Sequence, residues 1–118
     1  MARKAIFLLV LVVASGLIAC NAKPSSTKYT FVLVTMRKYS IHPAIINVNQ
    51  GDNVELDVST ADIQHGFQVP DLGINEPVQP GKPVKIKLNT SKKGEFAVAC
   101  SIICGPGHDD MKAMIVVQ

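Results

Sequence analysis

Residues 100–111 have the sequence Cys-Ser-Ile-Ile-Cys-Gly-Pro-Gly-His-Asp-Asp-Met. These twelve residues offer two thiols, an imidazole and a thioether, at Cys100, Cys104, His108 and Met111. Thiolate, imidazole and thioether groups are soft or borderline ligands, which suit copper better than magnesium or calcium. The Gly-Pro-Gly turn in the middle can bring His108 back toward the two sulfurs. We therefore predict that these four side chains bind metal together.

The cysteine pair on its own leaves other uses open. A disulfide between Cys100 and Cys104 would close a small ring, which stabilises little. A thioredoxin-like redox pair would have a Cys-x-x-Cys spacing at a helix start. Zinc takes Cys and His readily but rarely Met. His108 and Met111 favour copper, and a thiol–disulfide enzyme that works without metal stays an alternative.

Outside this stretch the sequence predicts short β-strands. Residues 53–59 alternate between apolar side chains such as Val54 and acidic ones such as Glu55, as expected for a half-buried strand. The predicted strands span residues 29–36, 44–48, 53–59, 64–69, 84–88, 95–99 and 113–117. Residues 37–43 and 70–83 are predicted loops, the second because of its prolines and glycines. The pattern predicts an all-β, Greek-key β-sandwich of about seven strands without a substantial helix.

The N-terminal residues have the form of an export signal. Arg3 and Lys4 precede an apolar run over residues 5–19, which is short for a membrane-spanning helix. The sequence Leu-Ile-Ala-Cys at 17–20 resembles the lipobox of bacterial lipoproteins, which implies cleavage before Cys20 and lipid attachment to its sulfur. We predict a signal peptide at 1–19, a lipidated cysteine with a flexible tether at 20–28, and one domain at 29–118. A short, uncleaved membrane anchor is the alternative.

The charge of the chain is small. Its formal net charge is +3, and removal of residues 1–19 would lower it to +1. No basic cluster with interleaved aromatic residues is present, so nucleic-acid binding is not predicted. From the export signal we therefore expect the mature protein on the outward or periplasmic side of a bacterial membrane, held there by the lipid.

Several motifs together resemble the copper domain of heme-copper (cytochrome c) oxidase subunit II. They are Asp-Ile-Gln-His-Gly-Phe at 62–67, Leu-Gly-Ile-Asn at 72–75, Pro-Gly at 80–81, and Gly-Glu-Phe at 94–96 leading into Cys-x-x-x-Cys-Gly-x-Gly-His-x-x-Met. The chain is similar also to the C-terminal cupredoxin domain of nitrous oxide reductase. The resemblance covers about residues 29–117. It implies a cupredoxin-like fold and the dinuclear mixed-valence copper site called CuA.

Carried over residue by residue, the resemblance implies two copper ions and six protein ligands. These ligands are the side chains of His65, Cys100, Cys104, His108 and Met111 and the backbone carbonyl of Ile102. Both sulfurs would bridge the coppers, His65 and Met111 would complete one copper, and His108 and the carbonyl would complete the other. None of these groups is placed as an acid or base. We therefore expect an electron carrier rather than an enzyme, with no small-molecule substrate. Asp62 is expected to form a turn, and orienting His65 is its alternative role.

Three features depart from the oxidase pattern. No transmembrane helix is evident beyond the signal, Ile102 stands where many oxidases carry a magnesium-binding glutamate, and the chain has no Trp, which the family often uses where electrons enter. These departures favour a free-standing, lipid-anchored carrier that exchanges electrons with redox proteins such as a c-type cytochrome. A copper-binding subunit II of a terminal heme-copper oxidase is the alternative, and a copper chaperone is a further one.

The surroundings of the ligands suggest where a partner would dock. Ile103 and Pro106 are expected on an exposed apolar rim beside the metal. We expect partners to dock there, because electron transfer needs short distances. Asp109 and Asp110 either steer a basic partner or are solvated loop acids. No role follows from the sequence for His42, which is expected at the surface beside a proline.

Overall fold

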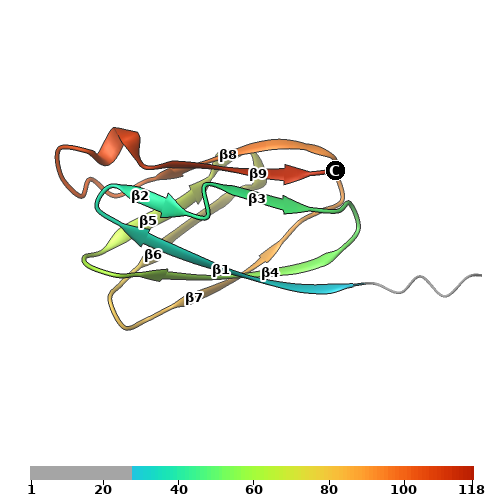
Figure 1. Cartoon of the computed structure of the whole chain (residues 1–118), viewed down its shortest axis with the longest axis horizontal. Helices are drawn as coiled ribbons and strands as arrows, with labels where there is room; N and C mark the ends of the chain where they lie inside the picture. Colours follow the sequence, from blue (N-terminus) through green and yellow to red (C-terminus); the bar gives the residue numbers. More distant parts are fainter. Residues whose placement is uncertain (1–27) are drawn as a thin grey trace, which may run out of the picture.

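The computed structural model describes residues 28–118, and within them nine strands form two sheets packed face to face (Figure 1). The strands are β1 (Tyr29–Arg37), β2 (Ser40–His42), β3 (Ile45–Val48), β4 (Asn53–Thr60), β5 (His65–Val69), β6 (Ile74–Val78), β7 (Val84–Leu88), β8 (Gly94–Cys100) and β9 (Lys112–Val117). Two 3-10 turns, η1 (Pro70–Leu72) and η2 (His108–Asp110), complete the elements. The predicted all-β sandwich is confirmed. The predicted signal peptide and the lipidation of Cys20 lie outside the described residues.

The strand order places the core between the sheets. One sheet has the order β2-β1-β4-β7 and the other β3-β9-β8-β5-β6. β1 pairs with β4 in parallel and β3 with β9 in parallel, while the other neighbours are antiparallel. The largest fully buried side chains are Phe67, Met36, Leu56, Met111 and Ile115. No helix in this part of the chain is long and apolar enough to span a membrane.

The structure corrects the two predicted loops, because each contains a short strand. β2 lies within residues 37–43 and pairs with the last three residues of β1. β6 lies within residues 70–83 and forms an edge of its sheet, with Pro77 opposite Gly66. Proline is tolerated on an edge strand because its missing N–H removes no hydrogen bond there. The seven predicted strands therefore become nine.

The topology brings two distant segments to one end of the sandwich. The loop over residues 101–111 joins β8 to β9, which are antiparallel neighbours. β5 pairs with β8 on its other side, with Phe67 opposite Cys100. Because β5 begins at His65, this register places the histidine beside the loop. The loop forms the left-hand end of the molecule in Figure 1.

Candidate metal centre

His65 belongs to the candidate centre and is fully buried at the start of β5. Its Nδ1 is 3.9 Å from the sulfur of Cys100, which ends the neighbouring strand β8. Single ligand atoms of His65, Cys100 and Cys104 all lie within 4.8 Å of one another. The structure therefore brings His65 to the cysteine pair although 35 residues separate it from Cys100.

The remaining predicted ligands surround the same two sulfurs. Cys100 Sγ lies 3.1 Å from the carbonyl oxygen of Ile102. Cys104 Sγ lies 3.7 Å from Nδ1 of His108 and 3.4 Å from Sδ of Met111. Met111 is almost fully buried. All six predicted ligand groups thus converge, and their ligation of metal stays a prediction.

Backbone hydrogen bonds hold the loop closed around these groups. The N–H of Cys100 donates to the carbonyl of Met111 at 3.3 Å, so the first and last ligands of the loop are tied together. The N–H of Met111 donates to His108, and the N–H of His108 donates to Gly105. The N–H of Ser101 donates to Gly66 of β5 at 3.0 Å. The predicted ligand groups are therefore positioned by the fold itself.

Tyr39 packs against the ligand loop, and our sequence reasoning missed it. A Cβ atom added at Gly107 would lie 2.4 Å from Cγ of Tyr39, and one added at Gly105 would lie 2.3 Å from the tyrosine hydroxyl oxygen. Gly105 also has a φ of 140°, which L side chains rarely adopt. The two glycines of the turn therefore let an aromatic ring cover the loop. Their spacing in the sequence signals a close approach, but it does not identify the residue that approaches.

We predict that Gly107→Ala disturbs this packing. Gly107 has an ordinary φ of −97°, so the new methyl group would act through its clash with Tyr39 alone. Overpacking of this kind costs about 1–3 kcal/mol. Denaturant unfolding measures this loss, and the cost should shrink when Tyr39→Ala is already present, because neighbouring changes are not additive. An equal cost in both backgrounds would contradict the contact.

Asp62 hydrogen-bonds the ring nitrogen of His65 that does not face Cys100. Its Oδ1 lies 2.8 Å from Nε2 of His65, and the backbone N–H groups of Lys38 and Ile63 donate to the same carboxylate at 2.7 Å each. Partial burial acts to raise the pKa of Asp62, but these donors and His65 outweigh it and hold that pKa well below its usual range. An ionised carboxylate accepts a hydrogen bond from the Nε2–H group of His65, which leaves Nδ1 free to bind metal. Asp62 therefore both forms the turn that we expected and orients His65, which was its alternative role.

We predict that Asp62→Asn weakens metal binding more than folding. Loss of a group that orients a ligand typically lowers metal affinity by about 10–100-fold, and asparagine keeps the shape of the side chain. Competition with a chelator measures the affinity. Asp71→Asn is the matched control, because Asp71 is exposed on η1. Equal affinities of the two variants would show that Asp62 does not support the centre.

The donor set fits a soft metal. Both cysteines in the described part of the chain are free thiols. Burial raises the pKa of the Cys104 thiol, and the adjacent Cys100 raises it further. Two neighbouring thiolates in such a place need positive charge beside them, which metal ions would supply. Sulfur and imidazole nitrogen dominate the set, and these are ligands that copper binds well.

The fold and this centre define the class of protein. Residues 6–117 match the cupredoxin-like domain family, and the chain belongs to that family. It is similar to cytochrome c oxidase subunit 2 of Thermus thermophilus, with 33% identity over 91 residues that cover 77% of this chain and 67% of the relative. It is 38% identical to subunit 2 of Saccharomyces cerevisiae over 58 residues, which cover 49% of this chain and 23% of that protein. The predicted resemblance to subunit II is confirmed.

A solved structure shows the same fold. The periplasmic domain of subunit II of cytochrome oxidase from Bradyrhizobium japonicum superposes with a TM-score of 0.68 at 20% identity, covering 75% of this chain and 83% of that domain. The chain spans 54% of a second Thermus thermophilus subunit 2 and only 18% of the subunit 2 from Synechocystis. The similarity therefore concerns the copper-domain region of longer proteins and not their whole length.

Proposed function

We propose that this domain carries single electrons at a dinuclear copper centre of the CuA type. The observation that carries the proposal is the convergence of two free thiols with His65, His108, Met111 and one backbone carbonyl at the end of a rigid sandwich. The 33% identity to a cytochrome c oxidase subunit 2 supports it. When bound, the copper pair would supply a reversible one-electron change.

The residues of the chain are suited to that role. Two thiolates carry two negative charges, so an oxidised core with three positive charges would have a net charge of only +1 and a reduced core would be neutral. A low-dielectric environment tolerates such small charges better than an isolated multivalent ion. The ligands are fixed by strand pairing and by the Cys100–Met111 backbone hydrogen bond. The protein would therefore rearrange little when the electron moves.

The rim of the centre is the proposed docking site for redox partners. Ile103 is 85% exposed and lies between the two cysteines in the sequence, and Pro106 is also exposed. A c-type cytochrome that covers this apolar rim would come close to the ligands. Asp109 and Asp110 are exposed on η2 and would attract basic residues of such a partner.

We further propose that the domain is a free-standing carrier that a lipid on Cys20 holds at the outward face of a bacterial membrane. The lipobox-like sequence at 17–20 supports the lipid. The second candidate is a subunit II of a terminal heme-copper oxidase. It is favoured by the relatives, which are oxidase subunits. Stable co-purification of a heme-containing subunit with the chain would favour the oxidase subunit over the free-standing carrier.

The test is copper loading of the full chain. We expect two coppers per chain, and an electron paramagnetic resonance spectrum whose hyperfine splitting comes from one electron shared by two equivalent nuclei. One copper with a single-nucleus pattern, or no copper after dialysis, would overturn the dinuclear proposal and favour a chaperone or a thiol–disulfide protein. Mass spectrometry of the membrane-extracted N-terminus tests the lipid independently.

A further inference from the structure

The outer face of β1 carries a row of large exposed side chains. Tyr29, Phe31 and Leu33 are 74%, 67% and 74% exposed. They alternate along the strand and so lie on one face, which is opposite to the buried side chains of Val34 and Met36. Contiguous apolar side chains on a surface mark an interaction site far more often than scattered ones do. We call these three residues the β1 row.

The strand that carries the β1 row also forms an open edge. β4 pairs with β1 along Tyr29–Met36, but β2 on the other side pairs only with residues 35–37. No other strand within residues 28–118 pairs with the first half of β1. The backbone groups on this edge need water or another polar environment, since unpaired groups are too costly in hydrocarbon. The face therefore suits a partner that offers apolar and polar surface together.

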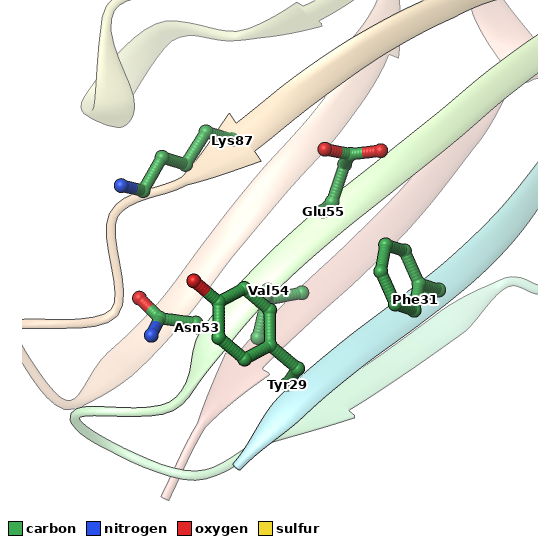
Figure 2. A pocket seen from close by; sticks show the side chains of 6 residues that line it. All are labelled: Tyr29, Phe31, Asn53, Val54, Glu55 and Lys87. Carbon is green, nitrogen blue, oxygen red and sulfur yellow. The ribbon is translucent and has the colours of Figure 1, made fainter. Parts of the chain in front are cut away.

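The charges around the row nearly cancel. Figure 2 shows Tyr29 and Phe31 along β1, with Glu55 and Lys87 on the next two strands of the sheet. Glu55 lies opposite Lys87 in the strand register and accepts a hydrogen bond from Lys85 at 3.2 Å. A partner of high charge, such as nucleic acid, is thus not selected. Tyrosine favours the boundary between lipid tails and headgroups, where one side is apolar and the other wet. Phenylalanine and leucine supply the apolar side chains that interfacial elements bury at this boundary.

The row lies where the chain enters the domain. β1 begins at Tyr29, and the chain from Cys20 to Tyr29 can span at most about 30 Å at ~3.3 Å per residue. A membrane that holds the lipid on Cys20, or the apolar run at 5–19, would therefore lie within reach of the row. In Figure 1 the start of β1 and the loop at 101–111 are at opposite ends of the molecule.

We propose that the β1 row docks on the lipid bilayer at the level of the headgroups. This inference rests on the membrane attachment proposed above. The attachment raises the local concentration of bilayer at the row, so weak contacts of three side chains are sufficient. Because the start of β1 and the loop at 101–111 lie at opposite ends of the molecule, docking of the row would leave the exposed Ile103 rim outside the membrane contact. A tethered domain would then present its centre to soluble partners instead of facing in all directions.

The absence of Trp from the chain provides a direct test. Phe31→Trp and Leu33→Trp are single reporters on the row. Ile45→Trp is the matched control, because Ile45 is 59% exposed on β3 and points outward from the other sheet. The full-length, membrane-extracted protein is mixed with vesicles of phosphatidylcholine and phosphatidylglycerol with brominated acyl chains. We expect the two row reporters to shift to the blue and to lose most of their emission, and the control to change little.

Flotation of the vesicles separates this inference from the attachment. If the protein floats but the row reporters and the control are quenched alike, or none is quenched, the row does not dock and the inference is overturned while the attachment stands. A blue shift that grows with protein concentration without lipid would assign the row to a second copy of the chain, which also overturns it. If the protein does not float, the attachment fails and the inference fails with it.

Discussion

Cys100→Ser and Cys104→Ser are each expected to lower the copper content from two ions per chain to one or none. A serine hydroxyl is a hard donor that does not ionise near neutral pH, so it cannot replace a bridging thiolate. Cys100 has His65 and the Ile102 carbonyl around its sulfur, and Cys104 has His108 and Met111. Loss of either sulfur would leave the two proposed copper positions with only one bridging thiolate. The electron paramagnetic resonance signal of one electron shared by two coppers should therefore vanish in both variants.

The control for these variants is the same substitution at the third cysteine. Cys20→Ser should retain two coppers and the shared-electron spectrum, because the six proposed ligands do not include Cys20. It should also release the protein from the membrane fraction if that cysteine carries the lipid. A variant of Cys100 or Cys104 that keeps both coppers and the shared signal would contradict the bridging role. Far-ultraviolet circular dichroism checks that each variant retains its strands.

The predictability of the centre depended on how far apart its ligands are in the sequence. Four predicted side-chain ligands lie within residues 100–111, where spacing and donor chemistry were sufficient to predict that they meet. His65 is 35 residues upstream of Cys100, and only the resemblance to subunit II pointed to it. The structure supplies the physical reason, which is the pairing of β5 with β8. Tyr39 could not be found, because its contact with two glycines depends on packing between elements far apart in the sequence.

The fold was predictable where burial imposes alternation. The residues that alternate over 53–59 form β4, with Val54, Leu56 and Val58 buried. β2 and β6 escaped prediction because they are short strands at sheet edges, where few side chains face the core. Pro77 within β6 argued against a strand for a reason that holds only for central positions. An edge position depends on the whole topology, which local patterns do not reveal.

Phe67→Ala is expected to destabilise the fold by about 3–5 kcal/mol, the usual effect of removing a fully buried aromatic side chain. Phe67 has no exposed surface and is among the largest buried side chains. The matched control is Phe31→Ala, which makes the same chemical change at a position that is 67% exposed. Such a surface change should alter the free energy of unfolding by less than about 0.5 kcal/mol. Denaturant unfolding of the metal-free protein measures both.

The effect of Phe67→Ala should extend to the centre, because the core and the ligands share a strand. Phe67 is two residues from His65 and lies opposite Cys100 in the register of β5 and β8. A cavity here would loosen the pairing that brings histidine and cysteine together, so copper retention against a chelator should fall as well. A metal that binds only the folded state stabilises it by an amount that rises with the logarithm of its affinity. Copper should therefore stabilise the native chain and the Phe31→Ala variant equally, and the Phe67→Ala variant less. Equal stabilisation of all three would show that the arrangement of the ligands does not depend on the packing of Phe67.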